Sequence, residues 1–279
     1  MEQQEHQRTM KLSISNIAWT GEQDETVYRW MQDLGFSGLE IAPTRVFPEG
    51  PYEHLEEAAG WAKKLKEEYG FTVPSMQSIW FGRTESLFGT EEERTALLNY
   101  TRKAIDFAEA VGCHNLVFGC PGNRNMPEMS EEYAVSCMDL AITFFRELGE
   151  YAWEHGTVIG IEANPTMYHT NFINATREAL DLVERVDSRG FLLNLDVGTM
   201  LANGEDCTKL KGRIGLVNHV HISEPGLKPI QKRSLHQELK KLLQEERYGG
   251  FVSVEMGKTE DGSPDAAKDA MSCVRSIFS

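Results

Sequence analysis

The sequence lacks several features that mark whole classes of protein. Its five cysteines are dispersed and form no CxxC pair, which indicates reduced thiols in a cytoplasmic protein. No apolar run approaches the roughly 20 residues that a membrane span needs, so we expect no membrane partner. Basic residues are also few: 28 Lys and Arg stand against 43 Asp and Glu. The net charge of −15 argues against nucleic acid as the main partner, because phosphate binding needs a basic surface.

Two further absences concern the start of the chain and its first loop. Residues 1–10 are polar and lack the apolar core of a secretory signal, so we expect a flexible N-terminal extension ahead of one domain at 11–279. No GxGxxG motif follows the first expected strand. A doubly wound dinucleotide-binding sheet, the alternative α/β architecture, therefore has no support.

Short apolar segments alternate with longer amphipathic segments along the whole chain. The pattern predicts strands at about 11–18, 39–42, 71–77, 115–118, 157–163, 191–197, 216–223 and 250–255. It predicts helices at about 25–34, 54–68, 91–111, 131–155, 175–186, 204–212, 231–245 and 264–277. Eight strand–helix units without a linker predict an α/β protein with a single (β/α)8 TIM barrel, which needs about 250 residues.

Ionisable residues stand at the ends of the last four expected strands. Because side chains alternate along a strand, Glu162, Asp196, His221 and Glu255 each share a face with a small or polar residue, while aliphatic residues take the other face. In a barrel, such strand ends meet at one mouth. Each carboxylate alone could be a loop or capping residue, and the pair His219 and His221 alone could equally be buried core histidines. Their joint occurrence favours a cation that neutralises them.

The donor set indicates which cation would bind. Three carboxylates and one neutral imidazole suit Mn²⁺ or Mg²⁺, and Co²⁺ or Zn²⁺ would also be compatible. Other polar and aromatic residues near strand ends are candidate substrate contacts, although core packing explains the tryptophan equally well and a solvated surface explains the lysine equally well. These candidates are Asn16, Trp19, Gln77, Asn123, Arg124, Asn164, His219, Glu224 and Lys228.

Four motifs carry a resemblance to a known family: GIEAN at 160–164, NLDVG at 194–198, HVHISE at 219–224 and SVEM at 253–256. The chain resembles the xylose-isomerase-like TIM barrels, which include sugar phosphate isomerases and epimerases, ketose 3-epimerases, inosose dehydratases and AP endonuclease relatives. The resemblance implies that Glu162, Asp196, His221 and Glu255 bind the metal. It also implies that Glu162 and Glu255 are the catalytic acid and base.

Two positions depart from the family pattern. Thr199 stands where relatives often carry a histidine, and Lys228 is the nearest cation where ketose epimerases place an arginine shortly after the residue equivalent to Glu224. Both positions contact substrate in the relatives, so the sequence leaves open which sugar is bound and whether it is phosphorylated. The missing histidine also weakens the AP endonuclease interpretation.

These observations lead to one functional hypothesis and three alternatives. We expect a metal-dependent sugar or sugar phosphate isomerase or epimerase, which transfers a proton next to a carbonyl through a metal-bound enediolate. Its partner would be a small sugar-derived molecule, and a homo-oligomer is compatible with the sequence. The alternatives are an inosose-type dehydratase, an AP endonuclease-like phosphodiesterase and a non-catalytic sugar-binding barrel.

Overall fold

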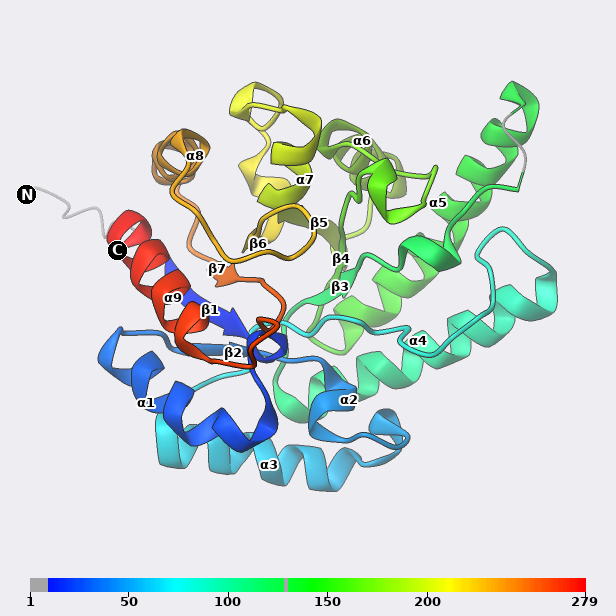
Figure 1. Ribbon diagram of the computed structural model, residues 1–279. Coiled ribbons are helices and arrows are strands. Elements are labelled where there is room, and N and C mark those ends of the chain that lie inside the picture. Colours follow the sequence, from blue (N-terminus) through cyan, green and yellow to red (C-terminus); the bar gives the residue numbers. More distant parts are fainter. Residues whose placement is uncertain (1–9, 128–129) are drawn as a thin grey trace, which may run out of the picture.

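A curved parallel sheet forms the centre of the molecule (Figure 1). The computed structural model describes residues 10–127 and 130–279, so the extension expected at 1–10 lies almost wholly outside the described residues. Seven strands pair in the order β2-β1-β7-β6-β5-β4-β3. Their bounds are Lys11–Ser15 (β1), Gly38–Glu40 (β2), Leu116–Phe118 (β3), Ile159–Ile161 (β4), Phe191–Asp196 (β5), Val217–Ile222 (β6) and Phe251–Val254 (β7).

The segment 71–77, which the sequence predicts as a strand, lies between β2 and β3 and closes the ring. It pairs in parallel on both sides through the isolated bridges Gly38–Thr72, Ile41–Met76 and Met76–Leu116. Pro74 has no backbone N–H to donate, which accounts for single bridges in place of a continuous ladder. With this segment, the sheet becomes the predicted (β/α)8 barrel.

Helices surround the sheet, and the last helix packs beside the first strand and the first helix (Figure 1). The apolar faces of the helices cover outward-facing strand residues such as Leu195, Val220 and Val254. None of the described helices is long and apolar enough to cross a membrane. The helices are Asp24–Asp33 (α1), Pro43–Val46 (α2), Leu55–Tyr69 (α3), Glu91–Val111 (α4), Glu131–Glu154 (α5), Thr176–Val186 (α6), Val197–Asn203 (α7), Ser234–Glu245 (α8) and Asp265–Phe278 (α9).

Local chemistry sets the ends of these helices. Thr90 caps α4 by accepting from the Glu93 amide, and the Glu93 carboxylate accepts from the Thr90 amide in return. The helix expected at 204–212 is wrong in position, since the structure has α7 at 197–203 and only a 3₁₀ turn at Cys207–Lys209. Asp196 explains the difference, because its carboxylate accepts from the Thr199 amide at 2.7 Å and so begins α7 directly after β5.

The inner face of the barrel is polar, as the strand alternation predicts. Asn115 donates to Ser75 Oγ at 3.0 Å and to Asn194 Oδ1 at 3.3 Å, across the interior. The hydroxyls of Ser13 and Ser253, on the paired strands β1 and β7, are buried without a hydrogen-bond partner. The interior therefore carries polar groups up to the level where the strands end.

Candidate metal centre and active site

Four side chains from four consecutive barrel strands meet at the C-terminal mouth. Glu162 follows β4, Asp196 ends β5, His221 lies in β6 and Glu255 follows β7. One donor atom from each lies within 4.8 Å of the others, and we call this set the four-residue cluster. The Nδ1 atom of His221 lies 3.1 Å from Glu162 Oε2 and 3.2 Å from Glu255 Oε2. The residues that the sequence predicts as metal ligands thus lie around one point.

The four-residue cluster is short of positive charge. Burial raises the pKa of Glu255, and burial together with the neighbouring Glu162 raises the pKa of Asp196. Burial would lower the pKa of His221, but the carboxylates of Glu255 and Glu40 raise it well above its usual value. A divalent cation would supply the missing charge, and three carboxylates with one imidazole are suitable donors for it. The residues present therefore fit a metal ion.

Amide side chains hold the Glu162 carboxylate in place. Asn164 Nδ2 donates to its Oε1 atom at 2.9 Å, and Asn194 Nδ2 donates to its Oε2 atom at 2.8 Å. Arg124 donates to Asn164 Oδ1 at 2.9 Å and so fixes which way that amide points. Gly119 leaves room beside the carboxylate, since a Cβ atom there would lie 3.1 Å from Glu162 Oε1.

Asp196 has its own set of donors. The Thr199 amide lies 2.7 Å and the Thr199 hydroxyl 2.8 Å from Asp196 Oδ2, and the Ser223 hydroxyl donates to Oδ1. Thr199, where the resemblance leads us to expect a histidine, contacts the carboxylate of Asp196. A Cβ atom on Gly198 would lie 2.7 Å from Ser223 Oγ, so glycine permits this close packing.

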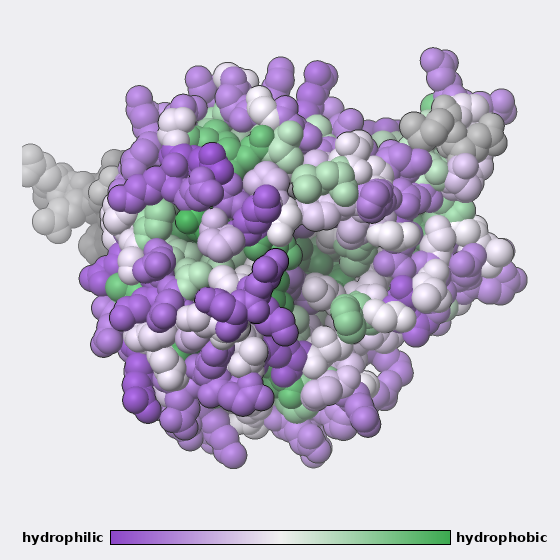
Figure 2. Space-filling view, viewed as in Figure 1, coloured by the Kyte–Doolittle hydropathy of each residue, from purple (hydrophilic) through white to green (hydrophobic). Residues whose placement is uncertain are grey.

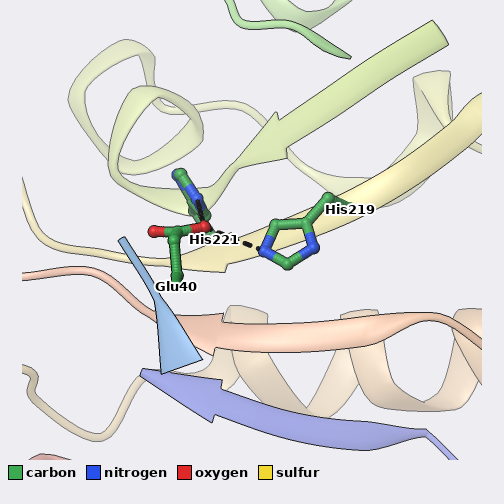
Figure 3. Close-up of side chains that lie close together, drawn as sticks. All are labelled: Glu40, His219 and His221. Carbon is green, nitrogen blue, oxygen red and sulfur yellow. Dashed lines mark hydrogen bonds and ion pairs between the residues drawn. The ribbon is translucent and has the colours of Figure 1, made fainter. Parts of the chain in front are cut away.

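A fully buried carboxylate, Glu40 at the end of β2, lies beside the rings of His221 and His219 (Figure 3). Its Oε2 atom is 2.9 Å from His221 Nε2 and 3.1 Å from His219 Nε2, although the His219 contact is out of line for a good hydrogen bond. Burial would raise the pKa of Glu40, but the two histidines hold it well below its usual range. With a cation bound in place of the Nδ1 proton, a neutral His221 would donate its Nε2–H to Glu40 and present Nδ1 to the four-residue cluster.

The four-residue cluster opens into a pocket of about 190 Å³. This volume is below the roughly 300–1,000 Å³ of sites for drug-sized ligands and suits a smaller molecule. Gln77, Asn164 and Glu224, three of the predicted substrate contacts, line the pocket, and so does Tyr168. The face drawn in Figure 2 is largely hydrophilic and is hollowed near its centre.

The other predicted substrate contacts lie outside the pocket lining. Asn16 and Trp19 are both buried. Asn16 accepts a hydrogen bond from the Ala42 amide, and Trp19 donates one to the Asp24 carboxylate. Asn123 donates to two carbonyls of the loop at 83–85. Arg124 is fully buried and His219 lies one layer deeper beside Glu40, whereas Lys228 is exposed next to the pocket-lining Leu227.

One charged residue near the pocket escaped sequence reasoning. Arg233 reaches back nine residues and binds the Glu224 carboxylate at both oxygens, at 3.0 and 2.6 Å. No local spacing signals this pair, because it depends on the path of the loop between β6 and α8. A second position, Cys120, lines the pocket with a left-handed φ of 42°, which is uncommon outside glycine and asparagine.

Comparisons with known proteins agree on the architecture. The sequence profile of the family described as "Xylose isomerase-like TIM barrel" matches residues 28–277. The 3-keto-D-glucoside 4-epimerase YcjR from E. coli superposes with a TM-score of 0.77 at 21% identity, over 96% of this chain and 100% of the other. A D-psicose 3-epimerase from Clostridium cellulolyticum H10 gives 0.73 at 16%, over 96% and 99%. An AP endonuclease, family 2, from Brucella melitensis gives 0.69 at 22%, over 91% and 96%. No curated protein matches significantly.

Proposed function

The chain belongs to the xylose isomerase-like TIM barrel family, and from this premise we propose that it is a divalent-metal-dependent sugar isomerase or epimerase. The observation that carries the proposal is the four-residue cluster, whose donor atoms lie within 4.8 Å of one another at the base of a small pocket. Structures named as sugar epimerases share the fold over nearly the whole chain, which supports the same choice.

Glu162, Asp196, His221 and Glu255 would hold the metal. Oxygen-rich donors of this kind favour Mn²⁺ or Mg²⁺, and they also accept Co²⁺ or Zn²⁺. When bound, the cation would stabilise negative charge on substrate oxygens during proton removal next to a carbonyl.

Glu162 and Glu255 are the proposed acid and base. Both carboxylates line the pocket, so both face the same bound molecule. One removes a proton from the carbon next to the carbonyl, and the other returns a proton to that carbon or to its neighbour. Hydrogen bonds from Asn164 and Asn194 keep the Glu162 carboxylate in place for this role.

The similarity to an AP endonuclease structure does not lead us to propose phosphodiesterase activity. The net charge of −15 opposes binding of a DNA backbone. The side chain of Thr199, which replaces a family histidine, is a hydroxyl that contacts Asp196. These two features favour a small sugar over an abasic DNA site.

Solvent deuterium exchange tests the proposal directly. The metal-loaded protein would be incubated in D₂O with ketoses and keto-glycosides, and uptake at the carbon next to the carbonyl would be followed by proton NMR. Glu162→Gln and Glu255→Gln should each slow exchange by about 10²-fold or more, because each removes a proton carrier. Metal content per chain, measured in the same samples, separates loss of the metal from loss of the proton carrier. Near-normal exchange in either metal-loaded variant would contradict the assignment.

A further inference from the structure

Glu224, in the wall of the pocket, forms an ion pair with Arg233. Glu224 lines the pocket, and its side chain is only 4% exposed. Arg233 donates to both carboxylate oxygens, and the Gln231 amide donates to Oε1 at 3.2 Å. A bidentate guanidinium–carboxylate pair of this kind is among the stronger charge-assisted contacts in proteins. Glu224, which lines the pocket, thus keeps the guanidinium of Arg233 engaged, and Arg233 itself is not among the lining residues.

The remaining charge in the pocket is negative. Among the described residues, those that line it include Glu162, Asp196, Glu224 and Glu255 but no lysine, arginine or histidine. A divalent cation would offset two of the three negative charges of the four-residue cluster, which belong to Glu162, Asp196 and Glu255. Arg124 cannot bind an anionic substrate group, because it is fully buried and donates to the carbonyl of Glu162 and to Asn164.

The backbone amides of Gly198 and Thr199, at the start of the helix next to the pocket, are already bonded within the protein. The N-terminus of a helix commonly binds phosphate, and α7 begins at the pocket. Its Thr199 amide, however, is bonded to Asp196 Oδ2 at 2.7 Å, and the Gly198 amide donates to Ser223 Oγ at 2.8 Å. An anionic substrate group would therefore meet like charge without a counter-charge among the side chains that line the pocket.

The uncharged side chains of the pocket suit hydroxyl groups instead. Tyr168 accepts a hydrogen bond from the Gly226 amide at 2.8 Å, so its own hydroxyl hydrogen remains available to a ligand. Burial raises the pKa of Tyr168, so the phenol stays protonated at neutral pH. Gln77 and Ser78 add further neutral polar groups to the same lining.

We propose that the substrate is an uncharged sugar, without phosphate or carboxylate. We further propose that Glu224 enforces this choice by holding the Arg233 guanidinium in their ion pair, so that it cannot bind an anionic group. The inference rests on the proposed isomerase or epimerase function and adds the substrate class to it. A ketose and its monophosphate differ only in the group that this pocket would reject, so they make a matched pair.

The test compares such pairs with the metal-loaded protein. Each six-carbon ketose or 3-keto-glycoside in the panel would be paired with its monophosphate, and exchange of the proton next to the carbonyl would be followed in D₂O. We expect kcat/KM for the uncharged member to exceed that for its phosphate by about 100-fold, since like charge in a binding site costs several kcal/mol. Exchange confined to phosphates would overturn the uncharged-substrate inference and leave the proposed function standing. No exchange with any compound would overturn both.

Substitution of Glu224 tests the role of the ion pair. Glu224→Gln keeps the shape but removes the charge that holds Arg233, so the preference for the uncharged sugar should fall by about 10-fold. Glu53→Gln, which breaks the exposed ion pair with Lys103, is the matched control and should leave the preference unchanged. An unchanged preference in a folded, metal-loaded Glu224→Gln protein would refute the role of Glu224. Phosphate turnover that Lys228→Ala abolishes would identify that exposed lysine as a phosphate contact and refute the proposal.

Discussion

Replacing Glu40 by glutamine should weaken metal binding although Glu40 does not belong to the four-residue cluster. Its carboxylate lies 2.9 Å from His221 Nε2 and is fully buried, so it fixes the ring orientation that presents Nδ1 to Glu162 and Glu255. Loss of such a partner typically lowers metal affinity by about 10- to 100-fold. This corresponds to about 1.4–2.8 kcal/mol of binding free energy.

The magnitude should fall near the lower end of that range for glutamine. Its amide oxygen can still accept the Nε2–H of His221, so the variant loses the charge of the acceptor but keeps the acceptor itself. Glu40→Leu removes both and leaves a buried N–H unpaired, which adds a penalty of about 1–3 kcal/mol to the folded protein. Glutamine is therefore the cleaner change.

Titration of Co²⁺ into the metal-free protein, followed by visible absorbance and by calorimetry, measures the affinity. Thermal unfolding of the metal-free variant serves as the control, because a purely structural defect would lower its midpoint without a separate effect on affinity. Elemental analysis gives the stoichiometry, which should be one ion per chain. Wild-type affinity in folded Glu40→Gln would refute the reasoning. Two ions per chain, with one lost in Glu40→Gln, would show instead that Glu40, His219 and His221 form a second site.

Three further predictions follow from the same geometry. Metal at about 100 times its Kd should add about 2.7 kcal/mol of stability and raise Tm by about 5 °C, and EDTA should reverse the shift; calorimetric scans without a shift for any of the four cations would contradict this. Burial raises the pKa values of Asp196 and Glu255, so protons compete with the metal at a higher pH than at ordinary carboxylates. The carboxylates of Glu255 and Glu40 also raise the pKa of His221, so affinity should fall as the pH is lowered through the range in which these groups bind protons, and a flat calorimetric profile would count against the cluster. Gly119→Ala should lower kcat/KM roughly 10-fold with little change in Tm, because its Cβ would lie 3.1 Å from Glu162 Oε1; unchanged kinetics would show that the carboxylate can shift freely.

The strand pattern predicted the barrel and the position of the four-residue cluster because both depend on local periodicity. Alternation along a strand decides which residues face inward, and parallel strands bring their C-terminal ends to one mouth. Glu162, Asp196, His221 and Glu255 therefore lie together as predicted. The exact hydrogen bonding of 71–77 was not predictable to the same degree, since Pro74 reduces its pairing to isolated bridges.

Residues that follow the strands were harder to place, because their side chains depend on loop paths. Arg124 stands three residues after the pocket-lining Pro121, yet it turns behind Asn164 and becomes fully buried. Arg233 lies nine residues after Glu224, and the loop between them returns it to that carboxylate. Spacing in the sequence carries no information on either outcome, since neither residue belongs to a periodic segment.

The two histidines of β6 show where alternation stops being sufficient. His219 and His221 share one face, and alternation alone treats them as equivalent. They lie about 7 Å apart along the strand, which is one full layer of a barrel interior. The register pairs His221 with Asp196 and His219 with Asn194, so only His221 reaches the level of the carboxylates. Glu40 contacts both rings. Only His221 also contacts the carboxylates of the four-residue cluster, whereas His219 lies deeper, in the polar interior of the barrel. Depth along the barrel axis, set by the register between neighbouring strands, therefore decides which histidine belongs to the four-residue cluster.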